Sequence, residues 1–306
     1  YRFPTRIEII NKNGKHVHTL RDMPLAESIP IGRDAVIDGP RSFGWRSDVG
    51  SKIYFTEALD GGDPRVDVSF QDEVFTLKSP FNGSPKSLIK LPLRYSGIRW
   101  GNESVALVSD RKWTERRTTT WRVNPETGRS EKIIDRLYED RYNDPGSPLT
   151  VLNEYGRAVL HIQDGVTILM SGIGASPEGD KPFLDKFNMD TKETKRLWRS
   201  KPPYYERVVS IMDKKGEVIL TSREAKDEPA NYYRRDVKNG KKESVTSFLH
   251  PYPQMKDVYK EMLTYKRDDG IDLSATLYLP PGHQPGDGPL PLLVWAYPRE
   301  FKTAQA

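Results

Sequence analysis

The side chains that could act as nucleophiles, bases or metal ligands are few in this 306-residue chain. It contains no cysteine, which excludes thiolate catalysis, cysteine–metal sites and disulfides within it. The Gly-x-Ser-x-Gly pattern of a strained nucleophile turn is also absent. All five histidines stand in strand-like or turn-like sequence, which favours a structural role: His16, His18, His161, His250 and His283. The chain is therefore predicted to hold no catalytic triad, metal or cofactor of its own.

Three further stretches resemble known sites only weakly. The glycine-rich segment 172–179 lacks the Lys-Ser/Thr pair and the following helix of a phosphate-binding loop. Segment 60–67 is rich in Asp and Gly but lacks the spacing of a calcium loop. The basic and aromatic stretch 111–122 is too short to predict nucleic-acid binding by itself. We interpret all three as loop or strand sequence.

These stretches lie within a repeated pattern of hairpins. Two apolar strand-like runs joined by a polar turn occur in 42–58, 96–110, 148–162 and 207–224, with spacings of 55, 53 and 59 residues between equivalent positions. A second hairpin follows each of them, and its turn is Asn82-Gly83, Thr127-Gly128, Asp190-Thr191 or Asn239-Gly240. Four antiparallel strands per repeat are typical of a β-propeller blade.

The repeat predicts four blades, with boundaries near residues 39, 94, 147 and 204. A lone hairpin at 6–20 adds half a blade at the N-terminus, which suggests an incomplete propeller over 1–253. A small independent propeller and an all-β sandwich are the alternatives. Helical periodicity is weak throughout, and only 254–262 could form a short helix.

Composition agrees with short, half-buried strands. Apolar residues make up 36% of the chain and aromatic residues 10%, too many aromatics for a disordered chain. The 48 basic and 43 acidic residues are interspersed, so the net charge of +5 indicates a solvated surface rather than a nucleic-acid footprint. No apolar run approaches the roughly 18 residues of a membrane-spanning helix.

The pattern changes after residue 253. Segment 259–282 is a single hairpin, and a Pro/Gly-rich linker occupies 280–291. The apolar run 292–298 then predicts a strand that is covered on both faces, as in an α/β sheet. No helix or sheet partner follows this run in the sequence, so the chain is expected to be cut within both a propeller and an α/β domain.

These features resemble the prolyl oligopeptidase family of serine peptidases, in which a β-propeller accompanies an α/β-hydrolase domain. The similarity is greatest to its chloroplast-type glutamyl endopeptidase branch and bacterial relatives. It rests on these segments: 23–36, 41–48, 57–69, 142–148, 171–185, 250–254, 259–282 and 288–302. One departure is Arg299, where the plant branch is expected to carry glycine. The resemblance implies that 254–306 are the opening strands of the hydrolase domain.

The resemblance also implies roles for particular residues. Tyr297 matches the family position whose hydroxyl donates a hydrogen bond to the oxyanion of the tetrahedral intermediate. Specificity for glutamate needs a cation near the substrate carboxylate, and Arg suits it because its planar fork binds carboxylates bidentately. Loops between the second and third strands of each blade can face the hydrolase domain in such propellers. They supply the candidates Lys112, Arg116, Arg117 and Arg223, although a solvated loop charge is the more common role for each such residue.

The predicted function is that of a propeller that gates peptide access to a Ser–His–Asp site beyond residue 306. The complete protein would be a serine endopeptidase or oligopeptidase that cleaves after glutamate, and this chain alone would be inactive. Its partners would be peptide or unfolded polypeptide substrates and the rest of the same polypeptide. The alternative is a non-catalytic propeller that binds peptides or proteins. The compartment stays open, between export in bacterial relatives and the plastid in plants.

Overall fold

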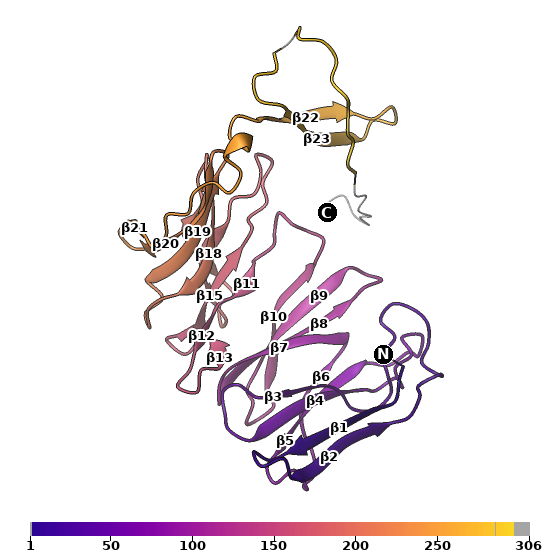
Figure 1. The fold of residues 1–306 in the computed structure, drawn as a ribbon. Coiled ribbons are helices and arrows are strands. Elements are labelled where there is room, and N and C mark those ends of the chain that lie inside the picture. Colours follow the sequence, from indigo (N-terminus) through magenta and orange to yellow (C-terminus); the bar gives the residue numbers. More distant parts are fainter. Residues whose placement is uncertain (1, 285, 297–306) are drawn as a thin grey trace.

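A computed structural model of the chain describes residues 2–284 and 286–296 (Figure 1). Nearly all of its regular structure is antiparallel β-sheet, as the hairpin pattern predicted. One 3-10 turn, Pro253–Met255, interrupts the strands. None of the helical structure in these described residues is long and apolar enough to cross a membrane.

Three blades are regular four-stranded sheets whose strands pair in the order of the sequence. Blade one contains β3 (Arg41–Trp45), β4 (Lys52–Ala58), β5 (Asp72–Lys78) and β6 (Lys86–Leu91). Blade two contains β7 (Arg94–Asn102), β8 (Val105–Lys112), β9 (Arg117–Val123) and β10 (Ser130–Leu137). Blade four contains β18 (Tyr205–Ile211), β19 (Val218–Ala225), β20 (Glu228–Asp236) and β21 (Lys242–Ser244). The predicted boundaries near 39, 94 and 204 are therefore confirmed.

The outer hairpins of blades two to four close through one recurring device. An Asn or Asp at the end of the third strand accepts hydrogen bonds from backbone N–H groups two and three residues ahead. Asn124, Asn188 and Asp236 hold this position. Such side chains imitate a backbone turn and so favour chain reversal at that point. The local sequence therefore specifies where these hairpins turn.

Blade three departs from the prediction that 148–162 forms its first two strands. Its second strand is β15 (Thr167–Gly172), followed by β16 (Phe183–Asn188) and β17 (Thr194–Arg199). Two short strands, β11 (Ser147–Pro148) and β14 (Ile162–Gln163), both pair with β15 and share the innermost position. Between them β12 (Thr150–Leu152) and β13 (Ala158–Leu160) form a separate hairpin. The sequence pattern of two apolar runs around a polar turn is the same for a hairpin within the blade sheet and for one outside it, so the pattern could not distinguish them.

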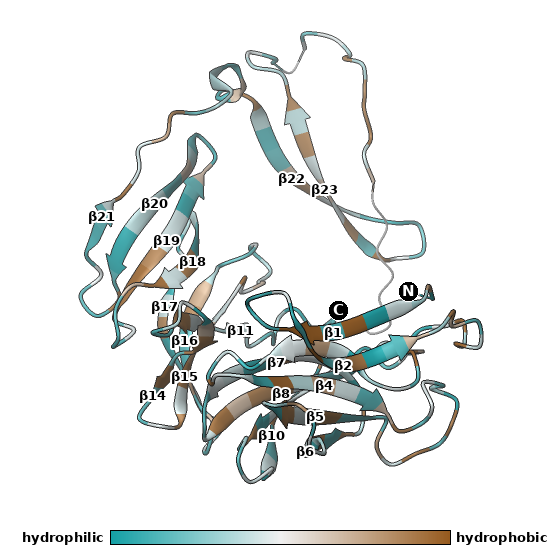
Figure 2. Cartoon of the chain, turned by 60° about the horizontal axis from the view of Figure 1, so that its bottom comes forward, coloured by the Kyte–Doolittle hydropathy of each residue, from teal (hydrophilic) through white to brown (hydrophobic). Residues whose placement is uncertain are grey.

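The core lies between successive blades, because each sheet packs one face on each neighbour. In β8, Ala106 and Val108 pack towards blade one, whereas Leu107 packs towards blade three. This alternation is the period of two that a strand imposes on its side chains. Leu169, Leu184 and Ile219 join blades three and four in the same way. Outer strands β20 and β21 are largely hydrophilic by comparison (Figure 2).

The N-terminal hairpin consists of β1 (Thr5–Ile10) and β2 (His16–Met23). Ile9 and Leu20 pack against Ile53 and Phe55 of blade one. This hairpin thus covers one face of blade one, in the position that a neighbouring blade would take.

Residues beyond 253 form a separate hairpin of β22 (Tyr259–Lys266) and β23 (Asp272–Leu279), which pairs with no strand of the blades. The short helix suggested for 254–262 is wrong beyond the 3-10 turn, because β22 begins at Tyr259. The strand predicted from 292 is also wrong for the described residues 292–296, which have no regular structure. Trp295 is 86% exposed there. A strand needs a partner for its backbone groups, and no described strand lies alongside this run.

Candidate functional site

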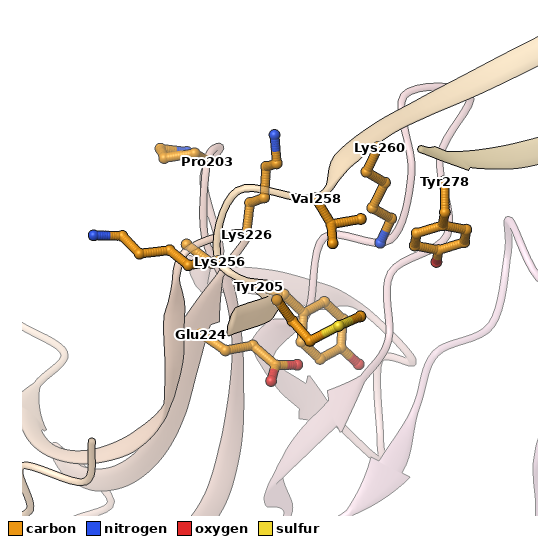
Figure 3. Close-up of a pocket in the computed structure, with 10 residues that line it drawn as sticks. Pro203, Tyr205, Glu224, Lys226, Lys256, Val258, Lys260 and Tyr278 are labelled. Carbon is orange, nitrogen blue, oxygen red and sulfur yellow. The ribbon is translucent and has the colours of Figure 1, made fainter. Parts of the chain in front are cut away.

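A cavity of about 470 Å³ separates blade four from the C-terminal hairpin (Figure 3). Tyr205 and Glu224 form its floor as directly paired residues of β18 and β19. Lys226, in the turn between β19 and β20, lines it together with Lys260 and Tyr278 of the hairpin. The loop between the second and third strands of blade four therefore faces the residues after 253.

Three lysines surround this cavity and only one carboxylate lies within its wall. The ammonium groups of Lys226 and Lys256 extend away from its centre (Figure 3), whereas Lys260 lies 5.6 Å from the centroid of the Tyr278 ring. Partial burial is the main cause of a raised pKa for the Tyr205 hydroxyl, so this group stays protonated at neutral pH. The cavity thus combines the aromatic rings of Tyr205 and Tyr278 with one ammonium group, that of Lys260, and the carboxylate of Glu224.

Three of the four predicted substrate-binding cations gather around the turn between β8 and β9, and the fourth, Arg223, lies on blade four. Arg116 is buried in that turn, with its guanidinium 3.8 Å from the centroid of the Trp113 ring. Its Nε lies 2.8 Å from Glu139 Oε1, and its Nη1 donates to the Tyr138 hydroxyl at 3.2 Å. Arg116 thus holds the turn in place.

Arg117 and Lys112 are directly paired across β8 and β9. Arg117 donates two hydrogen bonds to Asp135, at 2.8 and 2.7 Å, and this fork lowers the pKa of the Asp135 carboxyl to about 2. Lys112 Nζ lies 2.6 Å from Glu115 Oε1. The Arg117 side chain is 46% exposed, so it is within reach of a ligand.

Arg223 is nearly buried at the carboxyl end of β19. Its guanidinium carbon lies 3.1 Å from the centroid of the Tyr204 ring. Carboxylate oxygens of Glu228 and Glu206 lie 3.5 and 3.9 Å from its nitrogens. A substrate carboxylate would have to compete with these acids, as it would at each of the other three candidate cations.

Sequence reasoning missed Arg207 on the inner strand of blade four. Its side chain is exposed and, within the part of the chain that the structure describes, makes no ion pair. It lines a cavity of about 350 Å³ between blades three and four, together with Ser147, Ser171 and Gly172. The signal in the sequence is weak, because Arg207 stands in a strand, YERVVSI, that also carries Glu206.

The sequence singled out further residues and segments besides these cations. Tyr297 and Arg299 fall outside the described residues. Asp60 of the Asp/Gly-rich segment is buried and paired with Arg94 at 2.6 Å. Segment 172–179 leads into β16, a strand rather than a helix.

No catalytic or metal constellation forms among residues 2–284 and 286–296. The histidines there make no hydrogen bond to a serine hydroxyl, and His161 instead contacts the Lys214 carbonyl oxygen at 2.9 Å. No group of three or more His, Asp or Glu side chains in this range could hold a metal ion.

Comparison with known proteins identifies relatives of the chain. It is 46% identical over 323 residues to a probable chloroplastic glutamyl endopeptidase of Oryza sativa subsp. japonica, and 42% identical over 324 residues to one of Arabidopsis thaliana. The chain is homologous to the chloroplastic glutamyl endopeptidases. Both alignments include the whole chain but only 34% of each relative, so the chain spans about a third of their length. The resemblance predicted from the sequence is thus confirmed.

Other comparisons add less. No protein-family model matches the chain. Oligopeptidase B from Trypanosoma brucei, with covalently bound antipain, superposes with a TM-score of 0.48 over 79% of this chain and 39% of that one, at 11% identity. A puromycin hydrolase gives 0.43 over 89% and 37%, at 15% identity. The assignment of blades rests on the strand pairing described above.

Proposed function

We propose that this glutamyl endopeptidase homologue is the propeller portion of a serine peptidase and gates peptide access to a Ser–His–Asp site carried elsewhere in the same polypeptide. The observation that carries the proposal is the 46% identity along the whole chain to a glutamyl endopeptidase about three times as long. Residues 254–306 would open the hydrolase domain. The exposed side chains of β22 support this, because a hairpin with that much exposed surface is suited to packing against a further domain.

The reaction would proceed through an acyl-enzyme. A serine hydroxyl, activated by histidine, attacks the peptide carbonyl, and an aspartate orients the imidazole. From this chain, Tyr297 would donate its hydroxyl to the oxyanion of the tetrahedral intermediate. One such donor stabilises the transition state by roughly 3–4 kcal/mol. No metal or cofactor has a part in this mechanism.

Cleavage after glutamate would need a cation facing the substrate side chain. Lys112, Arg116, Arg117 and Arg223 remain candidates, although their acidic partners would have to be displaced. Arg207 is the stronger candidate, because its guanidinium makes no ion pair with any residue that the structure describes and could bind a carboxylate without first breaking one. It lies two residues from Tyr205, which lines the cavity beside the C-terminal hairpin.

The catalytic proposal is tested with a fluorophosphonate probe, which labels activated serines. The complete protein should be labelled stoichiometrically. It should also cleave peptides that contain glutamate at the bond after that residue. This 306-residue chain alone should not react. Failure of the complete protein to react would favour a non-catalytic, peptide-binding propeller.

The specificity proposal is tested by Arg207→Gln in the complete protein. Loss of a charged hydrogen bond of about 1.5–3 kcal/mol should lower kcat/KM for a glutamate peptide by roughly 10–100-fold, mainly through KM. Arg99→Gln is the matched control, because Arg99 is an exposed arginine on the inner strand of blade two and makes no ion pair among residues 2–284 and 286–296. Equal effects of both changes on KM would reject Arg207 as the carboxylate-binding group.

A further inference from the structure

The hairpin β12–β13 is an insertion into the innermost strand of blade three. Leu149 N donates to Leu169 O at 2.8 Å, and Ile162 is paired with Ile168. The chain therefore leaves the sheet after Leu149 and rejoins it at Ile162, next to the place where it left. His161 N donates to Leu149 O at 3.1 Å and closes the base of the excursion.

The tip of the hairpin is fastened to blade one. Asn153 Nδ2 donates to Ser47 O at 2.8 Å, and Arg157 Nη1 donates to Arg46 O at 3.2 Å. Both acceptors lie in the turn between β3 and β4. Asn153 Oδ1 also accepts from the N–H groups of Tyr155 and Arg157, at 3.0 Å each, so the turn of the hairpin orients the amide that binds blade one.

The base of the hairpin is packed on blades two and four. A Cβ atom at Gly101 of β7 would lie 2.6 Å from Ile162 Cδ1 and 3.4 Å from Leu160 Cβ, so this glycine permits a close approach. His161 Nε2 contacts Lys214 O, and Gln163 Nε2 donates to Lys215 O at 2.5 Å. Lys214 and Lys215 belong to the turn between β18 and β19.

All of these contacts lie at one end of the blades. Ser47 and Lys214 occupy turns between first and second strands, and Gly101 lies near the end of β7 that leads into such a turn. The cavity at Tyr205 and Lys226 lies at the opposite end of β18, roughly 20 Å away for a seven-residue strand. Innermost strands border the central channel of a propeller. In a closed ring this end of the blades would form the mouth of the channel that is remote from β22–β23, and the hairpin would lie across it.

We propose that hairpin β12–β13 is a fixed cover over this mouth, so that polypeptide substrates reach the enclosed site from the other side of the blades. The inference rests on the proposed peptidase function. Contacts with three blades besides its own hold the hairpin in place, so it is not a free loop. Such a cover would keep long unfolded chains from threading through the propeller and would bias cleavage towards short peptides.

The test compares three forms of the complete protein. Asn153→Ala with Arg157→Ala removes both bonds to blade one and should raise turnover of an unfolded protein such as casein at least fivefold. Turnover of a ten-residue glutamate peptide should change less than twofold. Glu154→Ala, an exposed change in the same turn, is the control and should leave both rates unchanged. Amide hydrogen exchange of 150–160 verifies that the double variant loosens the hairpin.

A covalent crosslink distinguishes a fixed cover from a segment that must move for substrate to pass. Ser47→Cys with Asn153→Cys, joined by a short cleavable bismaleimide, should leave peptide turnover within twofold. A reversible loss of tenfold or more would show that substrate passes here and would overturn the proposal. The proposal would also be overturned if the double variant loosens the hairpin but the ratio of casein turnover to peptide turnover stays unchanged. If the unaltered protein neither reacts with a fluorophosphonate nor cleaves peptide, the peptidase function itself is rejected. The results with the crosslinked and the loosened variants do not bear on that function.

Discussion

At the residue scale, Asp110 is a buried carboxyl without an ion-pair partner among the described residues. It accepts hydrogen bonds from Thr119 Oγ1, from Trp121 Nε1 at 3.3 Å and from Leu93 N at 3.3 Å. Burial nevertheless raises its pKa to about 6, because these donors do not replace the lost hydration of the charged form. The folded protein therefore binds this proton more tightly than the unfolded chain, whose carboxyl has the ordinary value of 3.8.

This shift predicts that the free energy of unfolding falls as pH rises from about 4 to about 6, by roughly 1–3 kcal/mol for this group, and stays lower above that range. Asp110→Asn keeps the shape of the side chain, and Thr119 can accept a hydrogen bond from the new amide. The variant should lose this part of the pH dependence in urea unfolding between pH 4 and 7. A slope equal to that of the unaltered chain would contradict the shifted pKa.

Also at the residue scale, Tyr297→Phe in the complete protein tests the oxyanion donor. The ring stays and only the hydroxyl is lost, so turnover should fall about 10²–10³-fold with little change in melting temperature. A tyrosine that only packs would give the reverse: near-normal turnover and about 1 kcal/mol less stability from a lost hydrogen bond. Steady-state kinetics and calorimetry of this one variant distinguish the two roles.

At the scale of elements, stability depends on faces packed between blades. Leu169 is fully buried and packs with Leu184 of its own blade against Ile219 of blade four. Leu169→Ala should lower the free energy of unfolding by about 2–5 kcal/mol, through lost transfer free energy and the cavity left behind. Leu152→Ala is the control, because its side chain is 72% exposed, and it should cost less than about 0.5 kcal/mol. Urea titrations followed by tryptophan fluorescence measure both, and equal losses would refute the packing argument.

At the scale of the whole molecule, strand pairing separates 1–253 from 254–306. Among the described strands β22 and β23 pair only with each other, so a chain that ends at Pro253 should keep the β-sheet circular dichroism of the longer one. Its melting temperature should lie within about 4 °C, the shift expected from ~1 kcal/mol in a domain of this size. A loss of sheet signal or a larger shift would show that the C-terminal segment is integral to the blades.

The repeat, the blade boundaries and the turns of the outer hairpins could be predicted from the sequence alone. These are local properties: alternating apolar residues specify strands, and an Asn or Asp after the third strand specifies the reversal. The relatives were recognisable for the same reason, since motifs such as YKEMLTYKRDDGIDLSATLYLPPG are read from consecutive residues.

Contacts between residues far apart in the sequence could not be predicted and were found in the folded chain. Arg116 and Arg223 read as free loop cations, yet Glu139 and Glu228 pair with them, and nothing in the sequence shows which acid will lie within 4 Å. The hairpin at 150–160 has the alternation of blade strands, and only its contacts with Ser47 and Gly101 place it outside the sheet. The run from 292 has the composition of a buried strand, but a strand forms only where partner strands satisfy its backbone groups. The composition of a segment limits which structures it can form, and its contacts in space decide which of these it adopts.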